Sequence, residues 1–365
     1  MKYFHLFCLF AISPNLLCAL LVVKSAEPLE TFNELFFRKH GWLGADGIYS
    51  CKISDNLSIW HFADTFIGDR IENKRTDWTL IRNSVGIENV HQTLSSFNFY
   101  WTTQNSLTDS FYLPPDGKGW LWPKAMVYHE NKLHIFLTQL ENWGPNPAWD
   151  YGPIAAWTAV VENPTDTPTD WKIRYTRTPF IERSQQRNIT FDTSILRQDD
   201  YFYIYGFSES TENEKNIRDL ITSRVRVNQF LDYGSYEFYN GTNWVVNFTD
   251  ASSLFNAAGE FSVHYDNRLQ QYLAVYSDSF PSSDILARTA TTPSGPWSKP
   301  IKLYSVPEMI GKSNKFCYSG KAHPQMSGRN HLVVSYVCNS FVMNEVIDDA
   351  TMYMPKFVRI NYQLL

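Results

Sequence analysis

Three carboxylates, an amine and an imidazole stand at the beginnings of five short segments rich in β-branched and aromatic residues. These groups belong to Asp46, Lys124, Asp192, Glu260 and His323. If the five segments converge, the groups would face one pocket and perturb one another's pKa values. Glycoside hydrolysis needs two carboxyls of different pKa, one protonated as general acid and one ionised as base or nucleophile. The pattern therefore predicts a glycosidase-type site, provided that the fold brings the five openings together.

The elements that must position these groups repeat along the chain. Each opening segment is followed by a turn and a second β-rich run, and the openings recur roughly every seventy residues, as in repeat architectures. The opening segments are residues 45–50, 122–128, 189–196, 259–265 and 322–326. Residues 41–50 and 59–69 are expected to be two paired strands of the first unit. This repetition predicts an all-β fold, a five-bladed β-propeller with a central funnel. The final run, residues 357–362, is expected to close the ring by joining the first blade.

Each candidate carboxylate also has a simpler structural interpretation. Asp46 precedes Gly47 and could hydrogen-bond its own turn, and Asp64 could cap the turn before Gly68. Asp192 lies in an apolar strand, where a buried carboxylate needs a partner such as Arg187 or Lys124. We expect Asp46 to be the base or nucleophile and either Glu260 or Asp192 to be the general acid. The candidate catalytic residues are thus Asp46, Asp192 and Glu260.

Other residues near the openings could bind the substrate. Aromatic rings stack on sugars, although a tryptophan is more often packed in a core. His323 could be a packed histidine, could orient a carboxylate, or could ligate a central cation, which is the minority interpretation. We expect no metal site and no cofactor. The candidate binding residues are Trp42, Asp64, Trp122, Lys124, Arg187, Tyr318, His323 and Asn339.

The N-terminal residues have the features of a secretory signal. Lys2 precedes an almost wholly apolar run, residues 6–23, and small residues near Ala26 offer a cleavage point. We therefore expect a signal peptide at residues 1–26 and one propeller domain at residues 27–365, secreted to the extracellular space or the periplasm. An uncleaved membrane anchor is the alternative, and a lipoprotein signal at Cys18 fits less well.

Cysteine content and composition narrow the class of protein further. A disulfide between Cys317 and Cys338 is plausible because both belong to the last unit, which leaves Cys51 as an apolar residue. The formal net charge is -5 and there is no basic run, which argues against nucleic acid as a partner. Aromatic residues make up 16% of the chain, which suits a carbohydrate-handling β protein. We expect a polysaccharide or glycan partner and no stable membrane association after cleavage.

A family resemblance covers nearly the whole mature chain. It is carried by residues 44–50, 60–68, 82–84, 261–263, 295–298 and 323–339. In these motifs the chain resembles secreted five-bladed propellers of the DUF4185 and DUF5005 type. Those are similar, more remotely, to the arabinanase and xylosidase propellers of glycoside hydrolase family 43, and some relatives are implicated in D-arabinan cleavage.

The resemblance implies a glycosidase in which Asp46 matches the acidic residue of the first blade. The chain departs from the arabinanase pattern in two places. Lys124 stands where those enzymes carry a carboxylate, and Asp192 stands where they carry the acid as Glu. The implied substrate is a polysaccharide with arabinofuranosyl or related sugars. The alternative is a catalytically silent, lectin-like propeller that binds a glycan.

Overall fold

The described part of the chain folds mainly into β-strands. The computed structural model describes residues 21–91, 94–146, 150–184, 187–210, 218–311 and 314–364. Most of the expected signal peptide therefore lies outside the described residues. Two short α-helices, α1 (Glu30–Asn33) and α2 (Met343–Asp348), are the α-helices of the described chain. None of its helices is long and apolar enough to cross a membrane.

Five sheets of four or more strands follow one another along the chain. The first contains β3 (Tyr49–Ser54), β4 (Leu57–Phe62), β7 (Ser84–His91) and β8 (Leu94–Tyr100). The second contains β11 (Trp120–His129), β12 (Lys132–Asn142), β13 (Tyr151–Val161) and β14 (Ile173–Thr178). The third contains β15 (Ile181–Arg183), β16 (Arg187–Gln198), β17 (Tyr201–Ser210), β18 (Arg218–Arg226), β19 (Glu237–Tyr239), β20 (Trp244–Val245) and β21 (Phe255–Ala257). The fourth contains β22 (Phe261–Asp266), β23 (Gln271–Ser277), β24 (Asp284–Ala290) and β25 (Ile301–Ser305). The fifth contains β26 (Lys315–Ala322), β27 (His331–Ser340), β28 (Lys356–Leu364) and β1 (Leu21–Pro28).

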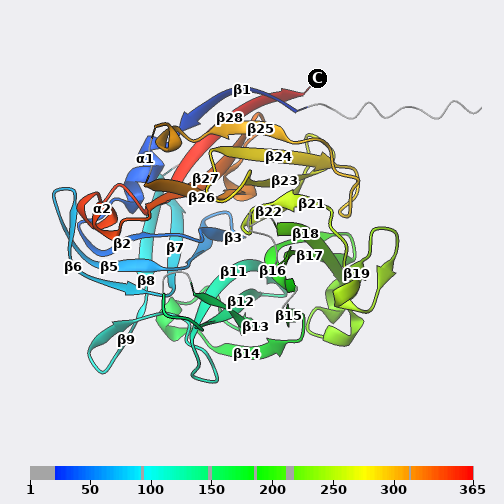
Figure 1. The fold of residues 1–365 in the computed structure, drawn as a ribbon, viewed down its shortest axis with the longest axis horizontal. Coiled ribbons are helices and arrows are strands. Elements are labelled where there is room, and N and C mark those ends of the chain that lie inside the picture. The colour runs from blue at the N-terminus through cyan, green and yellow to red at the C-terminus, as the bar shows by residue number, and fades with distance from the viewer. Residues whose placement is uncertain are drawn as a thin grey trace, which may run out of the picture.

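Two smaller sheets accompany these five. One contains β2 (His40–Ala45), β5 (Thr65–Ile71) and β6 (Lys74–Ile81), and the other is the hairpin of β9 (Thr102–Gln104) and β10 (Leu107–Asp109). Figure 1 shows the large sheets around a common centre, with β3, β11, β16 and β22 closest to it. Neighbouring strands of this inner group contact one another: β3 with β11, β11 with β16, β16 with β22, and β22 with β26. The inner strands therefore bring residues distant in sequence to one central region.

The hydrophobic core is divided among the faces between successive sheets. Ile59 and Ile135 share a cluster between the first and second sheets, and Phe136 and Phe202 share one between the second and third. Further clusters join the third sheet to the fourth, the fourth to the fifth, and the fifth to the first. The last of these contains Trp60 from β4 and Phe357 from β28. Each sheet thus buries both of its faces, which accounts for strands that are apolar along most of their length.

The first unit does not pair as the sequence suggests. Residues 41–50 and 59–69 pair with each other, but the pairing is split between two sheets: β3 pairs with β4, whereas β2 pairs with β5. Both runs cross from one sheet to the other at Asp46 and Asp64. Gly47 allows the crossing, because its φ is +82° and a Cβ there would lie 2.9 Å from the Ala63 nitrogen.

The fifth unit opens earlier than expected. The inner strand β26 ends at Ala322, and Pro324–Met326 is a 3₁₀ turn, so residues 322–326 are not the opening strand. Proline cannot donate a ladder hydrogen bond, which explains why the strand stops before it.

The C-terminal strand also pairs differently from the expectation: β28 pairs with β27 and with the N-terminal strand β1, and not with the first large sheet. The expectation that residues 357–362 join the first blade is therefore wrong.

Candidate functional site

Asp46 and Asp64 face each other where the first unit crosses between sheets. The Ala63 N–H donates to the Asp46 carbonyl at 3.0 Å, and the Asp46 N–H lies 3.4 Å from the Asp64 carbonyl. These backbone bonds hold both residues at the end of the central region where β3 begins. The two acidic residues are therefore neighbours, as expected of the paired runs 41–50 and 59–69.

Asp64 is held by side chains from two other elements. The guanidinium of Arg82 donates to its Oδ2 at 3.0 Å, and the indole N–H of Trp122 donates to its Oδ1 at 2.9 Å. Burial raises the pKa of Asp64, and the charge of Arg82 with the two hydrogen bonds offsets only part of this effect. The side chain predicted to bind substrate is thus an anchored carboxylate next to Asp46.

Asp46 is the most perturbed carboxyl of this group. The hydroxyl of Tyr318 donates to its Oδ2 at 2.5 Å. Burial is the largest cause that raises the pKa of Asp46, and the negative charges of Asp64 and Glu260 raise it further. Hydrogen bonds from Tyr318 and Tyr353 lower the pKa of Asp46, but the net result is a pKa of about 7. A carboxyl with a pKa near 7 can hold and release a proton around neutral pH. Such a group can serve as a general acid.

Glu260 lies between two ammonium groups. The Nζ of Lys124 is 3.6 Å from one carboxylate oxygen, and the Nζ of Lys321 is 3.6 Å from the other. Burial alone would raise the pKa of Glu260, but the charges of Lys321 and then Lys124 outweigh it, so the pKa lies below its usual value. Lys321 is only 2% exposed and also donates to the Gly47 carbonyl, and burial lowers its pKa to about 8. At a pH below about 7 but above the pKa of Glu260, Glu260 is therefore ionised while Asp46 is protonated.

β-Bulges explain how three inner strands present their polar side chains. The ladder is irregular between Pro123 and Met126, between Thr190 and Ser194, and between Tyr318 and Lys321. A bulge interrupts strand alternation and re-aims side chains. Lys124 and Asp192 lie inside the first two irregular stretches, and Tyr318 and Lys321 bound the third. These residues consequently lie within their strands and not at the strand starts.

The hydrogen-bond partners of the Asp192 carboxylate are not those that the sequence suggests. Its carboxylate accepts hydrogen bonds from the hydroxyls of Thr138 at 2.5 Å, Thr193 at 3.0 Å and Thr190 at 3.4 Å, and the residue is 2% exposed. Neither expected partner forms an ion pair with it. Arg187 instead pairs with Glu182 at 3.4 Å and lines a separate cavity of about 510 Å³. The acid of the third strand is thus enclosed by hydroxyl groups.

Two predicted binding residues lie in the core. Trp42 is 1% exposed, stacks on Phe99 and donates its indole N–H to Ser84 at 3.1 Å. His323 is 1% exposed, and its ring nitrogens lie 2.6 Å from the Ser50 hydroxyl and 2.8 Å from the Ser335 hydroxyl. Burial lowers the pKa of His323 to about 3, so the ring is neutral. The packed-histidine interpretation describes His323, which nevertheless lines the cavity of about 610 Å³ between the inner strands, whereas Trp42 lines neither of the two cavities.

Asn339 and Tyr318 lie on the two paired strands of the fifth sheet. Asn339 is opposite Phe316 in the ladder, one residue beyond the Cys317–Cys338 pair. The side chain of Asn339 forms a hydrogen bond with the Tyr318 hydroxyl, which lowers the pKa of Tyr318. Burial and the charge of Asp46 outweigh this bond and raise the pKa of Tyr318 well above its usual value. Asn339 therefore supports the tyrosine that binds Asp46.

A cavity of about 610 Å³ is lined by residues of all five inner strands, among them Tyr49, Ala125, Thr193, Val263 and Lys321. Of the charged cluster, only Lys321 lines this cavity. Asp46, Asp64 and Glu260 line neither of the two cavities. Lys321 therefore connects the carboxylate cluster with the central cavity.

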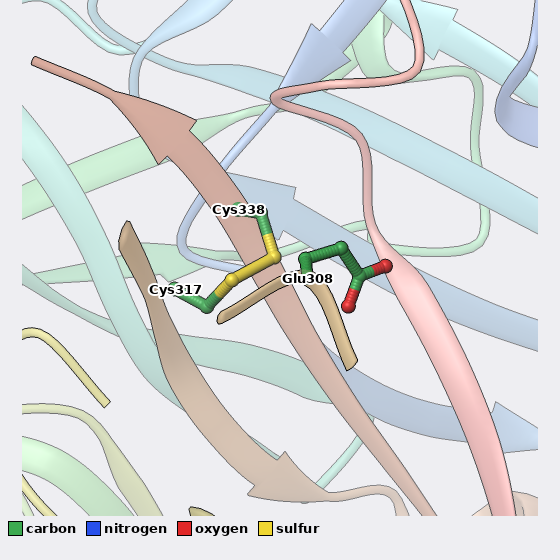
Figure 2. A group of neighbouring side chains, drawn as sticks. All are labelled: Glu308, Cys317 and Cys338. Carbon is green, nitrogen blue, oxygen red and sulfur yellow. A yellow bond between two sulfur atoms is a disulfide. The ribbon is translucent and has the colours of Figure 1, made fainter. Parts of the chain in front are cut away.

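The expected disulfide is present. Cys317 and Cys338 are bonded at 2.06 Å, and Cys51 is a free, partly buried thiol. Figure 2 shows the disulfide beside Glu308, the one group of three potential metal ligands found within the described part of the chain. The two sulfurs are bonded to each other and therefore cannot act as thiolate ligands.

Sequence reasoning missed Lys321 and Tyr353. Lys321 lies two residues before His323, and the misplaced start of the fifth inner strand concealed it. Tyr353 belongs to an irregular segment between α2 and β28, and no sequence pattern indicates that it reaches Asp46. Arg82 belongs to the motif of residues 82–84, but nothing in the sequence indicates that it pairs with Asp64.

Comparison with solved structures identifies the fold. A provisionally named hydrolase from Bacteroides ovatus matches with a TM-score of 0.75 and 18% identity, over 94% of this chain and 93% of that protein. The xylan β-1,4-xylosidase of Bacillus halodurans matches with a TM-score of 0.50 and 11% identity, over 88% of this chain and 53% of the xylosidase. At these identities the similarity concerns the fold alone. No curated protein matches in sequence.

By its fold alone, the chain is an all-β protein with a glycoside hydrolase-like fold. Residues 30–362 match the domain of unknown function DUF5005. The chain belongs to the DUF5005 family.

Proposed function

We propose that this protein is a glycoside hydrolase whose five large sheets are the blades of a closed propeller. The hydrophobic clusters between successive sheets, including the one between the fifth and the first, support the ring. The fold shared with a xylosidase supports the reaction class. The substrate would be a polysaccharide, with arabinofuranosyl or related sugars as the resemblance implies.

In this proposal Asp46 is the general acid. It gives its proton to the glycosidic oxygen as the bond between that oxygen and the anomeric carbon breaks. Glu260 is the ionised carboxylate, which either attacks the anomeric carbon or removes a proton from the attacking water. These roles reverse the expectation that Asp46 is the base, because its pKa is raised to about 7 whereas that of Glu260 is lowered. Asp192, enclosed by three hydroxyls, supports the site from within the third sheet.

One observation carries the proposal: two carboxyls of the same buried cluster have pKa values moved in opposite directions. Such a pair supplies an acid and a base at one pH. Lys124 and Lys321 keep Glu260 charged, and the charge of Glu260 helps to keep Asp46 protonated.

Reducing-sugar release from arabinan, arabinogalactan, xylan and fructan tests the proposal. We expect cleavage of at least one polymer, lost in both Asp46→Asn and Glu260→Gln. Asp55→Asn is the matched control, because Asp55 is an exposed carboxylate paired with Lys52. Cleavage that survives both substitutions would refute the assignment of the residues.

The second candidate function is a glycan-binding module without catalysis. It is favoured by one observation: Glu260 and Asp64 both have cationic partners, as expected of a structural ion-pair network. Silence on the whole panel, with retention of one polymer in affinity electrophoresis, would favour this alternative.

We further propose that the protein is exported, with a signal peptide in the first 26 residues and one domain at residues 27–365. The Cys317–Cys338 disulfide supports an oxidising compartment. The predicted cleavage point near Ala26 falls within β1, whose residues pair with β28 from Leu21 onward. N-terminal sequencing of exported protein tests the boundary, and a start several residues away from residue 27 would contradict it.

A further inference from the structure

A row of polar side chains on the third sheet lies directly beside Glu260. Asn188 on β16 is opposite Glu209 on β17, which is in turn opposite Arg218 on β18. Residues directly opposite each other in antiparallel strands point to the same face of the sheet, so the three side chains form one row across it. The Nη1 of Arg218 lies against Gly259, where a Cβ would be only 2.5 Å from it. Gly259 precedes Glu260, and the row therefore ends at the proposed ionised carboxylate.

Arg218 also belongs to the surroundings of Asp46 and Asp64. Burial is the main cause that raises the pKa of Tyr151, at the start of β13, and the charges of Asp64 and Asp46 raise it further. The charges of Arg218 and Arg82 lower the same pKa. One tyrosine is thus within electrostatic range of both carboxyls and of Arg218. The row and the carboxylate cluster therefore share one region of the molecule.

The row is partly open to solvent and can both donate and accept hydrogen bonds. Arg218 and Glu209 form an ion pair at 3.1 Å, and their side chains are 28% and 20% exposed. The guanidinium of Arg218 lies over the ring of Phe207, 4.9 Å from its centre, and Phe207 is itself partly exposed. A guanidinium donates through a planar fork and a carboxylate accepts, so such a pair can bind two neighbouring hydroxyls of one sugar. The adjacent ring offers an apolar surface to the same ligand.

Two atoms of the row lack a hydrogen-bond partner among the described residues. They are the Nε of Arg218 and the Oδ1 of Asn188, and both are buried. Arg224, at the other end of β18, differs in this respect, because its Nε donates to Glu237 at 2.8 Å. Leaving buried polar atoms unpaired costs free energy. A ligand hydroxyl, reached by a small rotation of either side chain, would offset this cost.

We propose that Arg218, Glu209 and Asn188 form the subsite for a sugar unit at the bond that is cleaved. This inference rests on the proposed function for the position of that bond. Arg218 would donate to one hydroxyl, Glu209 would accept from its neighbour, and the ring of Phe207 would contact a C–H face. Both hydroxyls must reach the ion pair together, so the subsite would select sugars by the relative orientation of two adjacent hydroxyls.

Affinity electrophoresis in gels containing arabinan, arabinogalactan, xylan or fructan measures binding at this subsite without requiring cleavage. We expect Arg218→Met and Glu209→Gln each to weaken retention by the preferred polymer about tenfold, since each removes one charged partner of the sugar. Arg224→Met and Glu237→Gln are the matched controls. They disrupt an ion pair of the same sheet with side chains 23% and 38% exposed, and they should leave retention unchanged.

Arg218→Lys keeps the test decisive if Arg218→Met does not fold. Lysine retains the charge beside Glu209 but lacks the planar fork, so retention should still fall several-fold. Thermal unfolding of each variant distinguishes lost binding from a lost fold. Unchanged retention in folded Arg218→Lys and Glu209→Gln, or an equal loss in Arg224→Met, would overturn the subsite.

Cleavage assays separate this inference from the proposed function. Weaker retention of the Arg218 and Glu209 variants, without any cleavage by the wild type, would support the subsite and refute the hydrolase. Cleavage by the wild type with a raised KM in Arg218→Met would support both. Cleavage by Arg218→Met with unchanged KM would refute the subsite and leave the hydrolase standing. Absence of wild-type retention in every gel would also overturn the subsite.

Discussion

Replacing Asp46 with asparagine should stabilise the fold at alkaline pH. The pKa of Asp46 is raised from 3.8 to about 7, chiefly by burial and then by the charges of Asp64 and Glu260. Above pH 7 the folded protein must hold an ionised carboxylate in surroundings that disfavour it, whereas the unfolded chain does not. Asparagine has nearly the same shape and never ionises, so it removes this penalty.

The size of the effect follows from the two pKa values. A difference of one pH unit is worth about 1.4 kcal/mol, so a change from 3.8 to 7 corresponds to about 4 kcal/mol. Asp46 is partly accessible to solvent, and we therefore expect about 2 to 4 kcal/mol. The sign is fixed by proton binding. Below pH 3.8 the carboxyl is protonated in both the folded and the unfolded protein, so its ionisation does not destabilise the fold. The destabilisation grows as the pH rises above 3.8 and is complete above about pH 7.

Urea unfolding at pH 4.5 and pH 8.5 measures this difference. Asp46→Asn should exceed the wild type in free energy of unfolding by about 2 to 4 kcal/mol at pH 8.5, and by much less at pH 4.5. Comparing variant with wild type at each pH cancels other titrating groups, such as the buried histidines. Asp55→Asn should show no such gain, because Lys52 lowers the pKa of Asp55. Equal effects at the two pH values, or a variant less stable at pH 8.5, would refute the reasoning.

Two further substitutions probe the groups around the cluster. Lys321→Met leaves Glu260 with one neighbouring ammonium, so the pKa of Glu260 should rise and the acidic limb of the pH–rate profile should move to higher pH; an unmoved limb would show that Lys321 does not control this carboxylate. Arg75, 1% exposed, donates to backbone carbonyls that include those of Leu43 and Val346. Arg75→Met should lower the free energy of unfolding by about 3 kcal/mol because these carbonyls lose their partner, and Arg75→Lys should lower it less. A loss below about 1 kcal/mol in urea unfolding would show that the carbonyls find other donors.

Several residues lie in other surroundings in the structure than the sequence predicts, for physical reasons that can be named. The sequence indicates that Asp46 and Glu260 belong together, because each precedes an apolar strand in a repeating unit. It could not show that Trp42 is enclosed in the core or that His323 is held between two serine hydroxyls, since a tryptophan or histidine beside a strand suits a core and a funnel rim equally. The fifth unit was placed several residues late, and this concealed Lys321.

Residue types and spacing along the chain predict the all-β class and the repeat of strand pairs, and they make the disulfide between Cys317 and Cys338 plausible. These depend on local alternation, turn residues and nearby positions in one unit, which a single chain segment records. The proton-holding carboxyl, by contrast, is known only from the folded arrangement of side chains. The pKa of Asp46 depends on burial and on Asp64 and Glu260, and that of Glu260 depends on Lys124 and Lys321. Such distances between side chains arise from the packing of whole sheets, and residue types and spacing along the chain do not encode them directly.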